Sequence, residues 1–470
     1  MLLITALCSR LSDTTLATLV KWLFSRQLLL PGPPWTFPNG QLLEKFLQGR
    51  QRSETWRLYG SVYRIWSLFT PEVVITASED VKMFYADSRH HEKSRSSNAG
   101  WLFEQLLGEA MGLTSGIKWR RTRTRFEAFF TSNYIREHGM VFNEEAKKYI
   151  GTCFQAGHEK HITEFSMFPF LCTARLVYGP LSKEDIDELF TLNNLRMRIF
   201  GKILQGGVIC FPIAKWCKWQ TIKDVERFTE RWCSFNIKMS QARRSSPIAG
   251  IFEGILGDKD ATKQILQTLD EMLFANLDVS AHILNALVVF LAESEDARNR
   301  VLQEMQSMSD VEEYCSRRDT FLHNCLLETM RLSPISAFTM PERSPNAKSF
   351  GHIQIPPHTW VIVDILSINH NPAFWGKDNG VFRPSRFENM EQKDVGHTKT
   401  FLLKWNLFTY GFGLRQCLGQ FLMDYIVKAF ITQLISQYRW TSHNKSNDPV
   451  LQSSAWTLST APNIQFLPHS

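Results

Sequence analysis

Apolar residues along this chain recur mainly at the spacing of helices. In the stretch 418–440 they fall on one helix face, at Leu418, Phe421, Leu422, Ile426, Phe430 and Leu434. A second long helical pattern runs from about 261 to 306, and residues 160–245 and 261–332 are predicted to be mainly helical. The pattern therefore predicts a mainly α-helical protein.

β-rich runs are few and lie in two parts of the chain. Runs 62–69 and 73–77 flank Thr70-Pro71, which predicts a hairpin, and runs 350–355 and 359–365 flank Pro356-Pro357, which predicts a second. Ser78-Glu-Asp80 precedes a helix predicted to begin near Val81. The predicted fold class is mainly α with a small β subdomain.

The strongest chemical signal lies in residues 408–420. Cys417 stands among Gly411, Gly413 and Gly419, after Arg415 and directly before a predicted helix. The glycines allow a tight turn that points backbone N–H groups at the sulfur, and a helix N-terminus lowers the pKa of a thiol. A thiolate held in this way is a candidate axial ligand of haem iron. The other cysteines lack these surroundings and are predicted to be small core residues: Cys8, Cys153, Cys172, Cys210, Cys217, Cys233, Cys315 and Cys325.

This segment resembles the haem-binding loop of the cytochrome P450 family, written F-G-x-G-x-R-x-C-x-G. The match is carried by the three glycines, Arg415 and Cys417, while Tyr410 stands where the family usually has phenylalanine. The resemblance implies the cytochrome P450 fold, with haem b (iron protoporphyrin IX) between the long central helix and the cysteine loop. It also implies Cys417 as the metal ligand.

Glu328 and Arg331 form a second motif. Residues three apart on a helix face the same way and can pair, and their apolar neighbours indicate that the pair is buried. They are similar to the family's E-x-x-R helix, and Arg386 in 382–387 is similar to its P-x-R-F element. The resemblance implies a structural charged triad that braces the thiolate loop.

Trp119 and Arg123 match the W-x-x-x-R motif, whose side chains reach a haem propionate in the family. A fixed guanidinium suits a carboxylate. Arg343, twelve residues after Arg331, resembles a further propionate arginine. The competing interpretation of 118–125 is a basic surface helix, because Lys118, Arg120, Arg121 and Arg125 crowd it.

Residues 274–280 look like the part of the family's central helix that crosses the oxygen-binding face. Asn276 replaces the usual glycine, Asp278 matches the acidic position implied in proton delivery, and Val279 replaces the usual threonine. Ser280 can supply the missing hydroxyl after a small helix distortion, or water and substrate hydroxyls carry the protons. Alternatively, Asp278 is an ordinary helix carboxylate.

Composition bounds the rest. The chain has 470 residues, 44% apolar residues and 34 phenylalanines, enough for a large core, and it has no linker or repeat. The resemblance implies one catalytic domain over 43–470. The odd cysteine count argues against a disulfide framework. The net charge of +7 is interspersed and does not suggest nucleic-acid binding.

No nucleotide-binding fingerprint is visible, so electrons are expected from a partner. The resemblance implies NADPH-cytochrome P450 reductase, with cytochrome b5 as an alternative donor. Lys404, Arg415 and Lys428 could face such an acidic partner, or be ordinary solvated cations.

The N-terminus predicts association with a membrane. Residues 1–30 are apolar but interrupted by charges, which favours an interfacial segment over a clean span. Residues 31–42 resemble the proline-rich hinge after the anchor of microsomal family members, which implies the cytosolic face of the endoplasmic reticulum. Residues 201–219 mix tryptophan, lysine and aliphatics and could contact the membrane, cover the pocket or enter the core.

The resemblance implies a monooxygenase that inserts one oxygen atom from O2 into a mostly apolar small molecule, as in fungal tailoring of secondary metabolites. Two alternatives stay open. One is a thiolate-haem isomerase or dehydratase that needs no external electrons, for which Val279 is the best support. The other is a non-catalytic haem-binding protein.

Overall fold

The structure is a computed structural model that describes residues 30–216, 219–275, 277–388, 403–442, 450–451, 458–459 and 463–469. The predicted membrane segment 1–30 lies outside these residues except for Leu30, and so do Cys8, Cys217 and Asn276.

Helices make up most of the described chain, as the apolar spacing predicted. The shorter N-terminal helices are followed by long helices in the middle and by one long helix near the C-terminus. The helices are α3 (Leu42–Leu47), α4 (Gly49–Trp56), α5 (Ser78–Tyr85), α6 (Trp101–Leu107), α7 (Gly116–Glu127), α8 (Ser132–Glu137), α9 (Gly139–Cys153), α10 (Met167–Tyr178), α11 (Lys183–Gln205), α12 (Gln220–Ala242), α13 (Pro247–Phe252), α14 (Lys259–Asp270), α15 (Leu277–Glu293), α16 (Glu295–Gln306), α17 (Val311–Ser316), α18 (Phe321–Leu332), α19 (Ile365–Asn369), α20 (Pro372–Trp375) and α23 (Gln420–Gln437).

The strands form small sheets. They are β1 (Val62–Ser67), β2 (Thr70–Ile75), β3 (Glu92–Lys93), β4 (Glu159–His161), β5 (Glu342–Arg343), β6 (Lys348–Phe350), β7 (Ile353–Ile355), β8 (Trp360–Val363), β9 (Tyr438–Ser442), β10 (Val450–Leu451), β11 (Leu458–Ser459) and β12 (Asn463–Pro468). The largest sheet has the order β1-β2-β8-β5-β3, and another has the order β4-β12-β9. The prediction of a mainly α fold with a small β region is confirmed.

The predicted hairpins are only partly right. β1 and β2 pair as expected, but the turn lies at Leu68 and Phe69, and Pro71 sits inside β2. The structure tolerates Pro71 because pairing of β2 with β8 begins only at Glu72. The prediction of a second hairpin between runs 350–355 and 359–365 is wrong. β7 pairs with β6, whereas β8 joins the large sheet parallel to β2. The helix predicted near Val81 begins at Ser78, without a side-chain cap.

The predicted helix over 261–306 is divided. Helix α14 continues into a π-helical turn at Glu271–Ala275 (η8), then α15 follows, and Ser294 separates α15 from α16. Lys259–Glu293 is long and apolar enough to cross a membrane, but 75% of its most apolar window is buried inside the protein. It is therefore the core helix that the periodicity predicted.

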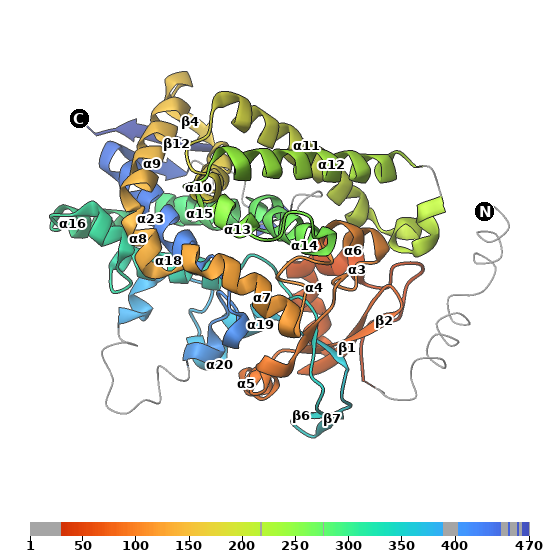
Figure 1. The fold of residues 1–470 in the computed structure, drawn as a ribbon. Helices are drawn as coiled ribbons and strands as arrows, with labels where there is room; N and C mark the ends of the chain where they lie inside the picture. Colours follow the sequence, from red (N-terminus) through yellow and green to blue (C-terminus); the bar gives the residue numbers. More distant parts are fainter. Residues whose placement is uncertain are drawn as a thin grey trace.

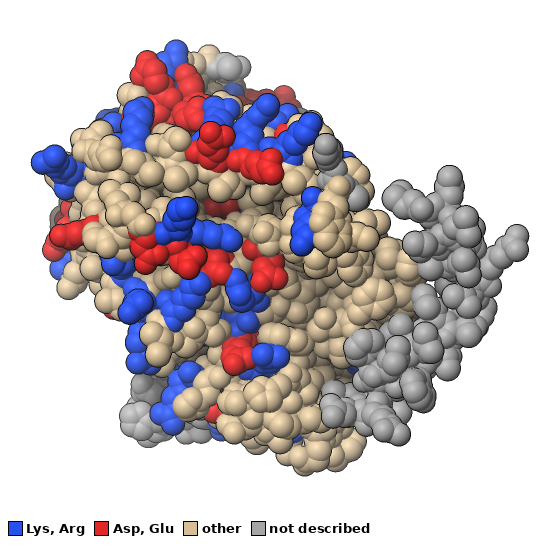
Figure 2. Space-filling view, turned by 45° about the vertical axis from the view of Figure 1, so that its right-hand side comes forward, with Lys and Arg blue, Asp and Glu red and all other residues tan. Residues whose placement is uncertain are grey.

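Helix α15 runs through the middle of the molecule, where it packs against α10, α18 and β9. Figure 1 shows α11 and α12 side by side above it, and the β1–β2 hairpin on the opposite side. One cluster of buried apolar residues extends from Leu42 to Phe466. Figure 2 shows charges of both signs interspersed over much of the surface.

The proline-rich stretch docks against the first sheet. Pro31 accepts a hydrogen bond from the Arg64 N–H at 2.9 Å, and the Trp35 indole donates to the Leu68 carbonyl at 2.7 Å. A side chain at Gly32 would meet the Arg64 carbonyl oxygen at 1.9 Å. The hinge predicted over 31–42 is thus packed on β1.

Candidate active site

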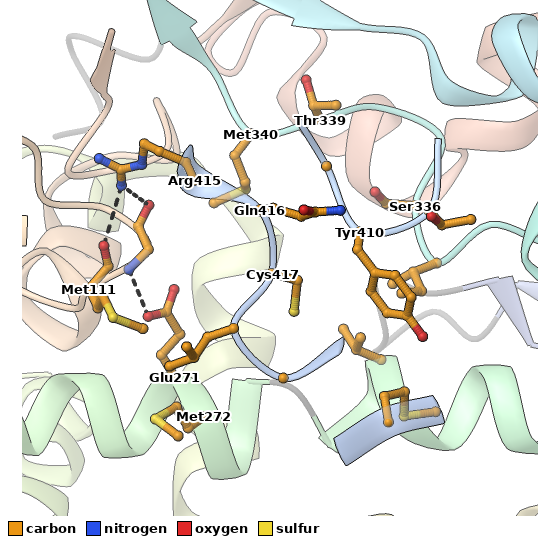
Figure 3. A pocket seen from close by; sticks show the side chains of 18 of the residues that line it. Met111, Glu271, Met272, Ser336, Thr339, Met340, Tyr410, Arg415, Gln416 and Cys417 are labelled. Atoms are coloured by element: carbon orange, nitrogen blue, oxygen red, sulfur yellow. Dashed lines mark hydrogen bonds between the residues drawn. The ribbon is translucent and has the colours of Figure 1, made fainter. Parts of the chain in front are cut away.

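A cavity of about 420 Å³ lies between the Cys417 loop and the central helix. Met272, Val279 and Ser280 face it from the helix side, and Tyr410, Cys417 and Gly419 face it from the loop side. Figure 3 shows the Cys417 side chain pointing from its loop into this space. The structure therefore brings the predicted thiolate and the predicted oxygen-side helix to opposite walls of one cavity.

The loop that carries Cys417 depends on glycine at two positions. Gly411 and Gly413 have φ values of 79° and 68°, a region that favours glycine. A side chain at Gly413 would also meet Ser88 Oγ at 2.4 Å. The Cys417 N–H donates to the Tyr410 carbonyl at 2.8 Å, which closes the turn.

The protein alone does not favour the Cys417 thiolate. The predicted helix α23 begins at Gln420 rather than directly after Cys417. Burial raises the pKa of the thiol, against a backbone hydrogen bond from Gly419 and the charge of Arg123. The prediction of a lowered pKa was therefore wrong for the protein groups by themselves. A metal cation at the sulfur would supply the missing stabilisation.

The predicted charged triad is formed and is fully buried. Arg331 donates to both oxygens of Glu328 at 2.7 and 2.9 Å, and Arg386 Nε donates to Glu328 Oε1 at 2.8 Å. Arg331 also donates to the Asn369 carbonyl at 3.0 Å. The Asn369 side chain in turn holds the backbone of Phe408, at the start of the Cys417 loop.

Basic and aromatic side chains meet at one edge of the cavity. Trp119, Arg123 and Arg415 all line it. The Arg415 guanidinium lies 4.9 Å from the centre of the Trp119 ring, and Arg123 donates to the Gln416 carbonyl at 3.2 Å. Arg123 also lies 4.0 Å from Glu127, so helix α7 has a surface side as well. This edge can receive carboxylate groups.

Arg343 does not join that edge. It lies on β5, where its guanidinium pairs with Glu92 at 2.6 Å and stacks over Trp360. Successive strand residues face opposite sides, so its neighbour Glu342 faces the cavity instead and pairs with Lys93. Arg343 therefore faces away from the cavity, on the other side of the strand from Glu342. Lys93 is a further cation that lines the cavity.

The predicted catalytic residues on α15 separate. Ser280 and Val279 line the cavity, whereas Asp278 is not among the residues that line it. Burial raises the pKa of Asp278, and the charge of Arg196 on α11 opposes the shift. Asp278 is thus a half-buried carboxylate within reach of the Arg196 charge and not a freely solvated one. The π-helical turn η8 lies directly before this segment.

Glu271 is a cavity residue that the sequence reasoning missed. Its side chain lines the same wall as Met272, and Oε2 accepts a hydrogen bond from the Gly112 N–H at 2.9 Å. Burial raises its pKa to about 7, with the Gly112 hydrogen bond and the Arg415 charge acting in the opposite direction. Its position eight residues before Val279 lies about 80° off that face in a regular α-helix, so helix spacing carried no signal for it.

Several expected neighbours lie elsewhere. Phe274, at the start of the segment that resembles the oxygen-side helix, is buried between Phe170 and Trp232. Lys428, expected on the surface, is fully buried and donates to the Arg317 carbonyl at 2.6 Å. Burial lowers its pKa to about 8. Of the three cations considered for a partner, only Lys404 is exposed.

The other cysteines behave mainly as small apolar residues. Cys172, Cys210, Cys315 and Cys325 are buried, while Cys153 and Cys233 are half-buried, and all are free thiols. None of the described residues forms a cluster of histidine, cysteine and carboxylate side chains that could hold a separate metal ion.

The residues at the cavity fit an iron porphyrin. The Cys417 sulfur faces the cavity, where it could ligate the iron of a bound haem. Arg123, Arg415 and Lys93 would suit two propionate carboxylates, and Trp119 offers a flat apolar face. This set of groups defines a haem-thiolate site.

Comparison with known proteins agrees. The model of the family described as cytochrome P450 matches residues 30–467. The chain belongs to this family. It is 34% identical over 450 residues to "Cytochrome P450 monooxygenase hasH" of Aspergillus fumigatus, covering 87% of this chain and 79% of the relative. It is 33% identical to "Cytochrome P450 monooxygenase sirC" of Leptosphaeria maculans (93% of this chain, 87% of the relative) and 33% identical to "Cytochrome P450 monooxygenase gliC" of Aspergillus fumigatus (93% and 89%).

Proposed function

We propose that this protein is a haem-dependent monooxygenase that inserts one oxygen atom from O2 into a mostly apolar small molecule, as a tailoring step in secondary-metabolite biosynthesis. The observation that carries the proposal is the Cys417 sulfur, which faces Val279 and Ser280 across one cavity. The relatives named above are cytochrome P450 monooxygenases from fungi.

A bound haem b would supply oxygen activation, and the protein would supply its environment. Cys417 would be the axial ligand, and Arg415, Trp119 and Arg123 would hold the propionates. Gly411, Gly413 and Gly419 keep the loop narrow enough for the sulfur to reach the centre of the cavity.

Protons need a separate route on the oxygen side. Ser280 is the hydroxyl on the α15 wall, and it would donate and accept a proton in place of the threonine replaced by Val279. Asp278 would take up protons from the solvent side and pass them on, because its raised pKa eases protonation of its carboxylate.

The electron source is a partner protein. Cytochrome P450 monooxygenases need a reductase, and the proposed one is NADPH-cytochrome P450 reductase, with cytochrome b5 as an alternative donor. The exposed Lys404 would contribute to the contact surface.

The proposed location is the cytosolic face of the endoplasmic reticulum. Residues 1–30 would associate with the membrane, 31–42 would form the connection, and 43–470 would be the catalytic domain. Exposed Phe37, Val208, Ile213 and Trp216 support this orientation. Asn39 accepts a hydrogen bond from the Gly207 N–H, which holds the two exposed segments together. In Figure 2, the lower right of the surface carries fewer charged side chains than the upper part.

The test is the absorption spectrum of the purified holoenzyme. The reduced carbon-monoxide adduct is expected to show the band of thiolate ligation in wild type, and Cys417→Ala is expected to lose it. Cys325→Ala is the matched control, since Cys325 is buried in the core away from the cavity. Nitrogen ligation in wild type would refute the proposal. Turnover without reductase and without oxygen would instead identify an isomerase or dehydratase.

A further inference from the structure

A second cavity opens from the wall opposite Cys417. Its volume is about 220 Å³, and it shares seven lining residues with the cavity described above: Leu113, Glu271, Val279, Ile335, Ser336, Thr339 and Met340. Its remaining wall combines the apolar Phe46, Phe103, Leu107 and Phe338 with the polar Lys45 and Ser97. The two cavities therefore meet along a wall that includes Glu271. A substrate that reaches toward Cys417 from the second cavity would pass this carboxylate.

The position of Glu271 is built by its surroundings. The Gly112 N–H holds Oε2 at 2.9 Å, and a Cβ at position 112 would lie 1.9 Å from Oε1. Only glycine leaves room for the carboxylate at this point. Arg415 donates to the carbonyls of Met111 and Gly112, so the same loop segment is fixed from the other side (Figure 3).

The carboxylate has no counter-charge in contact. Gly112 is the one hydrogen-bond donor to Glu271 found among the described residues. Arg415 is engaged with backbone carbonyls, and Lys93 is engaged with Glu342. The other charged side chain of the second cavity, Lys45, is paired with Glu72 at 2.8 Å. Oxygen Oε1 thus has no donor among the described residues, in a wall of apolar and hydroxyl side chains, and an unsatisfied acceptor in such a place is costly.

We propose that Glu271 is the substrate-recognition residue of this site and accepts a hydrogen bond from an N–H group of an otherwise apolar substrate. The inference rests on the proposed monooxygenase function and adds the class of substrate. A substrate with an amine or amide nitrogen satisfies Oε1, whereas a pure hydrocarbon of the same shape leaves it unpaired. A basic amine gives the strongest case, because a hydrogen bond between ionised partners is about twice as strong as a neutral one.

The test uses matched probes that bind haem iron through an imidazole. The probes are 1-(aminoalkyl)imidazoles of increasing chain length and the 1-alkylimidazoles in which a methyl group replaces the amine. Their dissociation constants for the holoenzyme are read from the shift of the haem absorption band. Wild type is expected to prefer the amine probe about tenfold or more at the length that reaches Glu271. Glu271→Gln is expected to lose this preference.

Two further variants sharpen the result. Glu54→Gln removes a charge from an exposed position of α4 and is expected to keep the preference. Gly112→Ala keeps the carboxylate but displaces it, and is expected to reduce the preference even if Glu271→Gln loads haem poorly. An unchanged preference in both cavity variants, or no preference in wild type at any length, overturns the inference. A protein that shows no imidazole shift at all overturns the proposed function as well.

Discussion

The side chain of Asn369 forms a two-way bridge to the backbone of Phe408. Its amide donates to the Phe408 carbonyl at 3.1 Å and its oxygen accepts from the Phe408 N–H at 2.7 Å. The Asn369 carbonyl accepts from Arg331, which is bound to Glu328. Asn369 is therefore the link through which the buried triad reaches the loop of Cys417.

We expect Asn369→Ala to destabilise this loop. The change leaves the Phe408 N–H and carbonyl, two partly buried groups, without these partners, at a cost of about 2 kcal/mol. Unfolding by denaturant and the rate of haem transfer to an acceptor protein would measure the two effects. Asn371→Ala is the control, because it removes only the cap of α20 and is expected to cost about 1 kcal/mol without faster haem transfer.

The basic edge of the cavity gives a second prediction. Arg415→Leu and Trp119→Ala are expected to weaken haem binding about tenfold or more, because charge-assisted contacts to the propionates are lost. Arg343→Ala is expected to leave it unchanged, since Arg343 pairs with Glu92 away from the cavity. Haem titration of the apoprotein would measure the affinities. Equal losses in all three variants would contradict the assignment of Arg343 to the outer face.

Proton delivery gives a third prediction. Ser280→Ala is expected to lower the product formed per oxygen consumed by roughly 10²-fold, as for loss of a proton-transfer group. Val279→Thr in the same chain is expected to recover part of it, because position 279 faces the same cavity. Oxygen consumption and product are measured with a substrate selected by its spin shift. An unchanged ratio in Ser280→Ala would assign the protons to water and substrate hydroxyls.

The stability of the fold should depend on pH through His282. Burial lowers its pKa from 6.5 to about 4, and one ring nitrogen faces the Ser333 carbonyl at 3.0 Å. Between these two pH values the unfolded chain binds a proton that the folded chain does not, so stability falls as the pH drops. His282 accounts for about 3 kcal/mol of that loss.

The His282→Gln variant should therefore show a shallower decline of the free energy of unfolding from pH 6.5 to 4 than wild type. Its stability at neutral pH is expected to be lower, because a packed ring is lost. His352→Gln, at an exposed loop position, should follow the wild-type curve. Parallel curves for wild type and His282→Gln would remove this histidine as the cause.

The sequence alone predicts those parts of the site whose residues lie within a few positions of one another in a motif. Glu328 and Arg331 are three apart on one helix, so their pairing follows from helix geometry alone. The turn around Cys417 follows from Gly411 and Gly413, whose positive φ values the sequence could anticipate.

Features that depend on partners distant in sequence could not be predicted in this way. The face of Arg343 is set by the pairing of β5 with β3 and β8, where a shift of one residue exchanges the two sides of a strand. Likewise, Glu271 becomes a cavity residue only because the loop of Gly112, far away in the chain, closes over it.

The π-helical turn at Glu271–Ala275 also bears on how this pocket could diverge. Such a turn accommodates one residue more than an ordinary helix, and each residue of an α-helix rotates the chain by about 100°. Removing the single amino acid between Met272 and Phe274 would restore a regular α-helix. It would also rotate Glu271 away from the wall that the two cavities share. Related enzymes could thus replace an acidic pocket wall by an apolar one through the deletion of one codon. The loop that carries Cys417 would not change.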